Sequence, residues 1–367
     1  MNNKTVLLVG GGSGGHLVPV FEVYKELKKN DSLNVLVVGS GSNIEKKFFE
    51  DNPDYRVIRT GKLGRKISVG NTRLFFRVFL GILDALKLLR KERPSVIFSK
   101  GGYVSFPVIF WAKLMRIPYF IHESDVEMGL SNKYASNKAK MVFVGYPLDF
   151  YKKGRNLVYS GQIIRSRKHI SKSNYKEFGF NRIKPVILIT GGSQGSLNMN
   201  KVVTQAVPRL LESYNIIHQT GELDFERVVR YRMTLDQQLS ENYYVSAFLP
   251  RHGKDWFFAA LSLAEVVVAR AGATTVAEIA SMGKPMILIP YKYAAGDHQN
   301  KNACFIMKNG GALVVNDDSF DADNLISNIE KAINKKEELT SKAGVIFPDN
   351  GIKTVISAIL DELERKK

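Results

Sequence analysis

The feature that most constrains the fold is a pattern that occurs twice along the chain. A short run of branched apolar residues ends in a glycine-rich loop, and an amphipathic helix follows. The first copy is TVLLVGGGSGGH, residues 5–16, and the second is PVILITGGSQG, residues 185–195. Strands buried on both faces read as continuous Val/Ile/Leu runs, and they belong to parallel sheets covered by helices. The pattern therefore predicts an α/β protein with two Rossmann-like, doubly wound halves.

Further strand-like runs follow each copy at the intervals that strand–helix–strand units need. They lie at residues 34–40, 95–102 and 119–124 in the first half, and at 215–221, 243–249, 265–272 and 285–290 in the second. We expect an N-terminal domain over residues 1–160 and a C-terminal domain over residues 161–349. The amphipathic helix at 350–367 is expected to pack back on either half.

The chain is strongly basic, with 53 Lys and Arg against 35 Asp and Glu, for a formal net charge of +18. Such a field attracts nucleic acid, anionic lipid headgroups or phosphorylated substrates, and charge alone does not choose among them. No apolar stretch reaches the ~18 residues of a membrane span, and the start is no signal peptide. The lone Cys304 predicts a reducing cytosol, and we expect it to be packed in a helix.

The first glycine loop fits the dinucleotide pattern G-x-G-x-x-G, but its context does not. The next strand ends in Gly39 and Ser40 and lacks the acid that would hold a ribose, and no G-K-[ST] closes a phosphate loop. His16 would lie on the first turn of the following helix, where the helix dipole disfavours imidazolium. It could then accept a proton, or it could cap or pack locally.

The second half offers its own anion-binding segments, TGGSQGS at 190–196 and RAGATTVAEIA at 270–280. Backbone N–H groups and hydroxyls at helix starts suit a pyrophosphate. Glu278, one turn into a helix, could accept ribose hydroxyls or be a surface acid. Gln299 and Asn302 could reach a sugar or be solvated.

Several motifs in order resemble the MurG family: GGGSGGH, KGGYVSFP, HES, LSNKYAS, GGSQGS, RAGATTVAEI and GDHQNKNA. These glycosyltransferases add N-acetylglucosamine, from UDP-N-acetylglucosamine, to the lipid-linked muramyl-pentapeptide of bacterial peptidoglycan synthesis. The resemblance covers roughly residues 5–312. It implies a GT-B fold, with two Rossmann-like domains facing one another across a cleft.

On the acceptor side, the resemblance places the first loop at the acceptor diphosphate and the reacting centre, through Ser13, Gly14, Gly15 and His16. The family's HEQN pattern reads HESD here, so Asp125 stands in place of an asparagine that touches the donor. Asp125 could be a second base candidate, or it could hold His16 or the acceptor hydroxyl.

On the donor side, the resemblance implies a UDP-sugar site. Its residues are Ser193 and Gln194 near the phosphates and sugar, Phe248 and Leu249 at uracil, Gly272, Ala273, Thr274 and Thr275 at the diphosphate, Glu278 at the ribose and Gln299 at the sugar hydroxyls. The resemblance also matches Arg165 to a substrate-site arginine next to the interdomain linker. Arg270 could help to stabilise the leaving diphosphate.

The implied reaction is an inverting displacement in which UDP leaves. The only Asp-x-Asp triplet, 321–323, reads as a helix start, so we expect no cofactor and no structural metal, although a divalent ion could stimulate. Alternatives are a diacylglycerol glucosyltransferase, a UDP-sugar 2-epimerase and a nucleic-acid binder; the ordered glycine loops speak against the last.

The segment 71–93 is too apolar for one buried stripe and is rich in Arg and Lys. With the resemblance, it predicts docking of the enzyme to an anionic membrane at the cytoplasmic face. The expected contacts are Arg73, Leu74, Phe75, Arg77, Phe79 and Trp111. The alternative is a helix buried against both the sheet and a neighbour.

Overall fold

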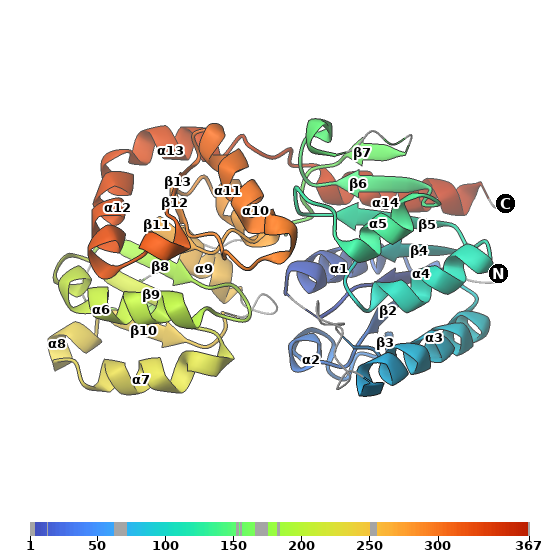
Figure 1. Ribbon diagram of the computed structural model, residues 1–367, viewed down its shortest axis with the longest axis horizontal. Helices are drawn as coiled ribbons and strands as arrows, with labels where there is room; N and C mark the ends of the chain where they lie inside the picture. Colours follow the sequence, from blue (N-terminus) through green and yellow to red (C-terminus); the bar gives the residue numbers. More distant parts are fainter. Residues whose placement is uncertain are drawn as a thin grey trace. The chain divides into compact units, whose positions relative to one another are not determined.

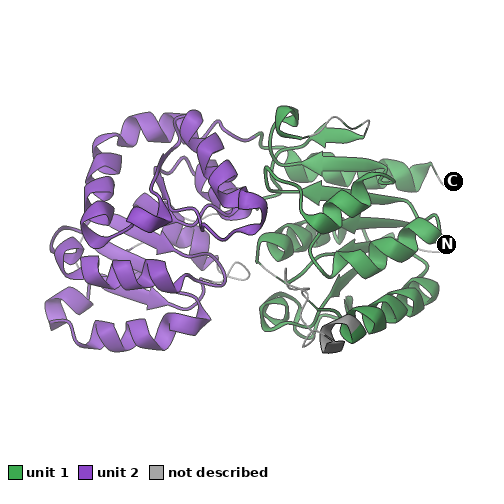
Figure 2. Ribbon diagram, in the orientation of Figure 1, with its two compact units in different colours: residues 1–165, 348–367 green, residues 166–347 purple. Residues whose placement is uncertain are grey.

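The computed structural model describes residues 4–12, 14–61, 72–151, 154, 156–165, 175–181, 184–249 and 255–365, with the backbone alone at 72–75. The chain divides into two compact units (Figure 2). Unit 1 comprises residues 1–165 and 348–367, and unit 2 comprises residues 166–347. The boundaries expected from the sequence lie after residues 160 and 349.

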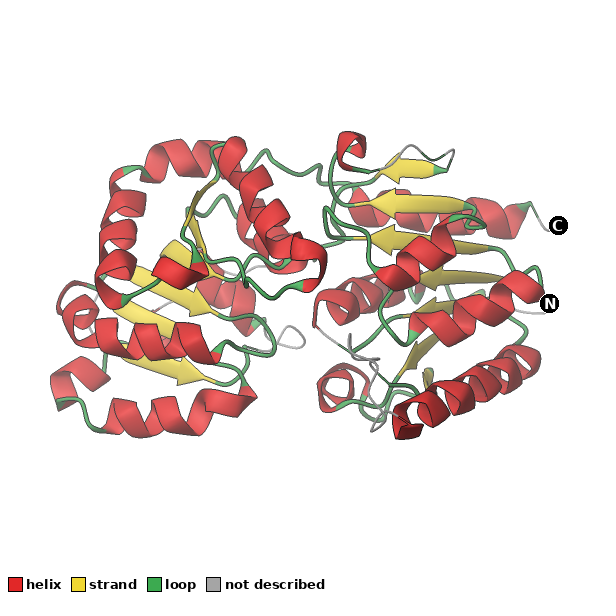
Figure 3. Cartoon of the chain, viewed as in Figure 1, coloured by secondary structure: helices red, strands yellow, loops and turns green. Residues whose placement is uncertain are grey.

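Unit 1 is built on a parallel sheet with helices between successive strands (Figures 1 and 3). Within the described residues the strand order is β3-β2-β1-β4-β5-β6-β7. The strands are β1 (Lys4–Val9), β2 (Leu33–Gly39), β3 (Tyr55–Val57), β4 (Val96–Ser99), β5 (Tyr119–Glu123), β6 (Met141–Val144) and β7 (Leu157–Tyr159). The helices are α1 (Gly14–Leu27), α2 (Asn43–Phe49), α3 (Thr72–Glu92), α4 (Ser105–Leu114), α5 (Leu130–Ser136) and α14 (Gly351–Glu364).

The C-terminal helix α14 completes unit 1, because it packs on α1 and β4. Val355 and Ile359 on its inner face are fully buried. A Cβ on Gly351 would come within 2.3 Å of the Gln162 carbonyl oxygen, so the helix starts in close contact with the strand-end segment of the same unit.

Unit 2 repeats this plan with a six-stranded parallel sheet in its described part, in the order β10-β9-β8-β11-β12-β13. The strands are β8 (Val186–Thr190), β9 (Asn215–Gln219), β10 (Tyr243–Ser246), β11 (Ala264–Ala269), β12 (Met286–Leu288) and β13 (Ala312–Val314). The helices are α6 (Leu197–Ser213), α7 (Phe225–Met233), α8 (Gln237–Ser240), α9 (Trp256–Leu263), α10 (Ala273–Ser281), α11 (His298–Lys308), α12 (Ala322–Asn334) and α13 (Lys336–Ala343).

Both sheets reverse their strand order at one point. In unit 1 this point lies between β1 and β4, and in unit 2 between β8 and β11. Connections leave in opposite directions there, so the loops at the carboxyl ends of the strands open a crevice in which ligands of such folds bind. The fold therefore directs attention to the loops 10–16 and 100–104 in unit 1, and to the loops 191–196 and 270–272 in unit 2.

Every helix within the described ranges is too short or too polar to cross a bilayer.

Candidate functional site

His16 lies at the switch point of unit 1 and is held by the loop that follows β4. Its Nδ1 is 3.2 Å from the Lys100 carbonyl oxygen. A carbonyl can only accept, so Nδ1 carries a hydrogen, and in the neutral ring Nε2 is then the nitrogen that can accept a proton. Gly102, at φ +82°, lies against the ring, since a Cβ there would be 3.4 Å from His16 Cδ2. The ring thus presents Nε2 as a proton acceptor.

Lys100 itself is buried beneath this contact, with an exposed fraction of 1%. Its Nζ donates to the His122 carbonyl oxygen at 3.5 Å. Burial lowers the pKa of the Lys100 ammonium, and the charges of Glu123 and Asp125 offset part of that effect. Burial likewise raises the pKa of the Glu123 carboxyl. Lys100 and Glu123 are therefore buried neighbours at the strand ends: burial disfavours the charged form of each, and the charge of the other partly offsets this.

Glu123 fixes the loop that carries Asp125. Its carboxylate accepts the N–H of Asp125 at 3.0 Å and the N–H of Gly129 at 2.9 Å. Asn132 donates to the same carboxylate at 3.0 Å, and the Tyr151 hydroxyl donates to the Asp125 carbonyl at 2.8 Å. The Asp125 backbone is thus fixed from both sides, while its half-buried side chain lies at the edge of the sheet.

The other residues of unit 1 that the sequence singled out are the acceptor-side glycine loop, Arg165 beside the linker and the expected membrane contacts. Gly14 and Gly15 form the first turn of α1, Arg165 is buried at the end of unit 1, and Ser13 lies outside the described residues. Arg77 and Phe79 are exposed on α3, whereas the side chains of Arg73, Leu74 and Phe75 also lie outside the described residues. Trp111 is half-buried and donates its indole N–H to the Ile82 carbonyl at 2.7 Å, so it ties α4 to α3.

In unit 2, the glycine loop after β8 packs tightly against the turn that follows β9. A Cβ on Gly195, at φ +75°, would lie 2.0 Å from the Thr220 carbonyl oxygen. Gln219 joins this loop to the segment after β10, because its side chain donates to the Gly192 carbonyl at 2.7 Å and accepts the Leu249 N–H at 3.2 Å. Ser193 is half-buried and Gln194 exposed between the two glycines.

These bonds bear on the segment expected at uracil. The Leu249 N–H is already bonded to Gln219, and the Phe248 carbonyl accepts the Ser246 hydroxyl at 2.9 Å. Recognition of a base through the Leu249 N–H would therefore require its hydrogen bond to the Gln219 side chain to break.

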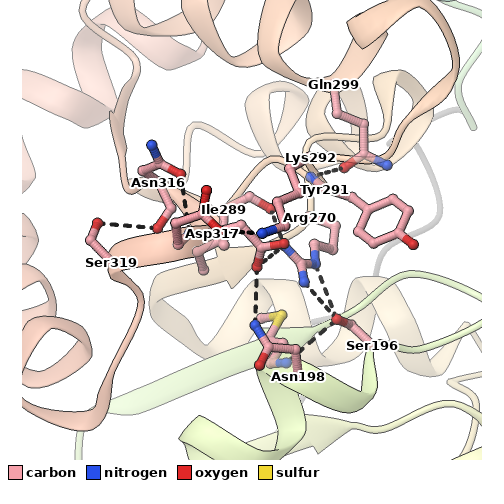
Figure 4. A network of polar contacts seen from close by, with 12 residues as sticks. Ser196, Asn198, Arg270, Ile289, Tyr291, Lys292, Gln299, Asn316, Asp317 and Ser319 are labelled. Atoms are coloured by element: carbon pink, nitrogen blue, oxygen red, sulfur yellow. Dashed lines mark hydrogen bonds and ion pairs between the residues drawn. The ribbon is translucent and has the colours of Figure 1, made fainter.

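Arg270 joins the donor-side loops through a buried network (Figure 4). Its Nη1 donates to Asp317 Oδ1 at 2.9 Å and to the Ile289 carbonyl at 3.0 Å, and its Nη2 donates to Ser196 Oγ at 2.8 Å. Both partners of the ion pair have side chains only 6% exposed. The guanidinium expected at a leaving diphosphate is thus bonded within the protein, and it positions loops from β8, β11, β12 and β13.

Gly272 lies before the first turn of α10, and nothing in the protein requires a glycine there. Its φ of −71° and ψ of 129° suit any residue, and a Cβ would meet no atom within 4 Å. A glycine with open space around it leaves the backbone at the start of α10 accessible to a ligand. Of the residues that follow, Ala273 and Thr274 are buried and Thr275 is half-buried.

Three polar side chains around α10 and α11 are placed by the structure. Glu278 is 1% exposed, so the surface-acid alternative is wrong. Asn302 is fully buried and donates to the Ala271 carbonyl at 3.1 Å, so it holds the loop before Gly272 and is not solvated. Gln299 accepts the Tyr291 N–H at 2.9 Å through Oε1, which leaves its amide NH₂ as a donor (Figure 4).

Two further expectations concern the Asp-x-Asp triplet at 321–323 and the thiol of Cys304. Asp321 caps α12 by accepting the Asn324 N–H at 2.8 Å, which confirms the helix-start interpretation of the Asp-x-Asp triplet. Within the described ranges no group of three or more His, Cys, Asp or Glu could hold a metal. The expectation of a packed Cys304 is wrong: the thiol is exposed, because α11 buries Asn302, Ala303, Phe305 and Ile306 instead.

The roles of Lys100, Glu123, Asn132 and Asp317 were not predicted, although the first three lie in the motifs KGGYVSFP, HES and LSNKYAS. The available signal was a charged residue directly at the end of an apolar strand, as in IFSK and FIHE. Such a charge is buried at a sheet edge only when partners from other loops compensate it.

Residues 6–144 match the glycosyltransferase family 28 N-terminal domain, and residues 186–351 match the C-terminal domain of that family. The chain is 33% identical, over 97% of its length and 99% of the relative's, to UDP-N-acetylglucosamine–N-acetylmuramyl-(pentapeptide) pyrophosphoryl-undecaprenol N-acetylglucosamine transferase 3 of Bacillus thuringiensis (strain Al Hakam).

Among solved structures, Acinetobacter baumannii MurG aligns with a TM-score of 0.70 at 24% identity, over 98% of this chain and 99% of that one. A putative UDP-N-acetylglucosamine 2-epimerase from Listeria monocytogenes aligns with a TM-score of 0.67 at 13% identity, over 98% and 97%. At these identities the likeness concerns the fold alone, which is the two-domain GT-B fold.

Replacing Gly272 with Ala tests the ligand explanation of this glycine. We expect unchanged or slightly higher stability, by about 0.4–1 kcal/mol, because the conformation suits alanine. UDP affinity, measured by calorimetry, should fall at least about tenfold, or ~1.4 kcal/mol. Gly344→Ala is the matched control, since Gly344 has a φ of −63° and ordinary contacts. Unchanged UDP affinity in Gly272→Ala would show that no ligand approaches this position.

Proposed function

The chain belongs to the MurG family of glycosyltransferase family 28, and we propose that it transfers N-acetylglucosamine from UDP-N-acetylglucosamine to the lipid-linked muramyl-pentapeptide of peptidoglycan synthesis. The relative from Bacillus thuringiensis, aligned from end to end, carries that activity in its name. The reaction is a hexosyl transfer in which an acceptor hydroxyl attacks the anomeric carbon and UDP leaves.

The orientation of His16 is the observation that carries the mechanism. Its Nδ1–H is bonded to the Lys100 carbonyl, so Nε2 is the atom that can take the proton of the attacking hydroxyl. Asp125 is the rival base; its backbone is fixed by Glu123 and Tyr151, which would hold its carboxylate at a constant place.

On the donor side, the start of α10 would meet the diphosphate. Its first N–H groups, beside the open Gly272, are fixed dipoles that stabilise negative charge as it develops on the leaving UDP. The Gln299 amide NH₂ would donate to a sugar hydroxyl, and Glu278 would meet the ribose. This charge stabilisation by the protein needs no cofactor, although a divalent cation could add to it.

The two competing enzymes share the architecture, so the fold does not separate them. The 2-epimerase aligns almost as well as MurG but at 13% identity, whereas the named transferases match the sequence over nearly its full length. An epimerase acts on the UDP sugar without an acceptor, and a diacylglycerol glucosyltransferase takes another acceptor. The identity of the acceptor therefore decides between the three activities.

A transfer assay with labelled UDP-N-acetylglucosamine tests the proposal, with the lipid-linked muramyl-pentapeptide, diacylglycerol or no acceptor. We expect product with the first alone. His16→Ala should lower turnover by about 10²–10⁴-fold, the usual contribution of general base catalysis, with little change in UDP affinity. Transfer to diacylglycerol, or epimerisation without acceptor, would refute the function. Full turnover in His16→Ala would assign the base to Asp125.

We further propose that unit 1 docks on an anionic membrane through α3 and the end of α4. Phe76, Phe79 and Leu83 are 62%, 56% and 44% exposed on α3, so α3 packs on its neighbour α4 but leaves these apolar side chains uncovered in unit 1. Leu114 and Met115, 61% and 40% exposed, add apolar side chains at the C-terminal end of α4, and α4 packs on α3. Exposed cations at Arg77, Lys87, Arg90 and Lys91 flank it.

This arrangement fits a peripheral enzyme at the cytoplasmic face of the membrane. The apolar side chains would enter the interface while the lysines and arginines contact anionic headgroups. The net charge of +18 favours such a surface as a partner, and no nucleic acid is needed to explain it.

The double variant Phe76→Ser, Phe79→Ser tests the docking surface. Sedimentation with phosphatidylglycerol vesicles should show at least about tenfold weaker binding, because each buried phenylalanine contributes ~1.5–3 kcal/mol. Activity on a water-soluble, short-chain acceptor should be retained. The double variant Leu223→Ser, Met233→Ser is the control, since these two residues of unit 2 are 85% and 77% exposed, respectively. Undiminished vesicle binding, or an equal loss on the soluble acceptor, would refute docking here.

A further inference from the structure

The buried carboxylate of Glu45 lies beneath the first glycine loop, although Glu45 belongs to α2 and not to that loop. Glu45 is fully buried. Oε1 accepts the Gly12 N–H at 2.9 Å and the Ser40 hydroxyl at 2.9 Å. Oε2 accepts the N–H of Ser40 at 2.7 Å, the N–H of Ser42 at 3.1 Å and the Tyr55 hydroxyl at 2.8 Å. Five donors thus converge on one carboxylate.

The Glu45 carboxylate explains why residues next to it are glycines, because it occupies the space that a Cβ would need. A Cβ on Gly11 would lie 2.1 Å from Glu45 Oε1, and a Cβ on Gly39 would lie 2.8 Å from Oε2. Burial and the Glu45 charge raise the pKa of the Tyr55 hydroxyl, which keeps it a hydrogen-bond donor. The small residues of VGGG and VVGS therefore admit an internal anion, and no bound nucleotide is needed to account for them.

This internal anion takes a place that a ligand takes in nucleotide-binding relatives of the fold. In a dinucleotide-binding unit, the N–H groups of the first glycine loop point at the pyrophosphate. Here the Gly12 N–H points at Glu45. A ligand anion at the Gly12 N–H could not share the hydrogen bond that Glu45 accepts there. It would also lie at about hydrogen-bond distance from the fixed negative charge of Glu45.

The same carboxylate is connected to His16 through the packing of the loop. Tyr103 lies on Gly12, where a Cβ would be 2.3 Å from its ring, and its hydroxyl is 3.3 Å from Ser40 Oγ. The next residue back, Gly102, lies against both the Gly11 carbonyl oxygen and the His16 ring. A shift of Gly12 would therefore move the contacts that orient the imidazole.

We propose that Glu45 is a positioning residue that stands in for a bound phosphate under the first glycine loop, so that the loop orients His16 for the acceptor and does not bind nucleotide. This rests on the proposed transfer reaction. Glu45 touches neither substrate in this account; it acts through the loop.

Replacing Glu45 with Ala would leave a cavity lined by the five donors, into which a small carboxylate fits. We expect turnover with the lipid-linked acceptor to fall roughly 100-fold, the effect of misplacing a reacting group by about 1 Å. UDP affinity, which depends on unit 2, should be unchanged. Formate should restore activity in a saturable manner, and chloride at equal ionic strength should not.

Two further variants keep the test decisive. Glu45→Gln fills the cavity but turns an amide NH₂ toward N–H donors, so it should be impaired and not rescued by formate. Glu50→Ala, which removes an exposed carboxylate directly after α2, should behave as the wild type. Turnover of Glu45→Ala above half of the wild type, loss of its UDP binding, or loss of activity without formate rescue would each overturn the proposal.

Formate binding to Glu45→Ala is also measured without turnover, as a rise in melting temperature that the wild type lacks. A wild type without transfer activity would refute the proposed reaction. A Glu45→Ala protein that formate does not stabilise would refute the phosphate stand-in.

Discussion

One polar contact in each unit joins the two loops that leave the sheet at its switch point, and the arrangement of the candidate sites depends on it. In unit 1 the contact is between His16 Nδ1 and the Lys100 carbonyl, at 3.2 Å. In unit 2 it is between Arg270 and Ser196 Oγ, at 2.8 Å. Parallel sheets place such loops side by side at their carboxyl edge, but they do not fix them. The contacts do so, and in unit 2 the Arg270 guanidinium is also bonded to the buried side chain of Asp317.

The two units start from the same strand–glycine loop–helix pattern and differ in what meets the backbone N–H groups. In unit 1 the Gly12 N–H is bonded to an internal carboxylate, that of Glu45. In unit 2, Gly272 has open space around it at the start of α10. A duplicated architecture can in this way divide a transfer reaction, with the acceptor and base on one unit and the nucleotide on the other. The division depends on a few side chains, because the backbone geometry is shared.

The long apolar strands were predictable from sequence because both faces of β1, β2, β8 and β11 are buried, which leaves a continuous signal. The three-residue strands β3, β7 and β13 and the four-residue β6 were missed, whereas the equally short β12 was predicted from the longer apolar run at 285–290. His16 was identified as a candidate base from the sequence because it closes a glycine motif. Glu45 was not, because its role arises from tertiary packing; the Ser42-x-x-Glu45 spacing, typical of a helix start, was its only local signal. The exposure of Cys304 shows the same limit for a single position on a weakly amphipathic helix.

Hydrogen–deuterium exchange in the presence of UDP-N-acetylglucosamine tests the division of the two units most directly. The account predicts that the donor alone protects residues 191–196 and 270–278, while residues 10–16 and 100–104 exchange as in the unliganded protein. Those unit 1 loops should become protected only when the lipid-linked acceptor, or a soluble analogue of it, is added. Protection of residues 10–16 by the UDP sugar alone, without protection of residues 270–278, would contradict the account.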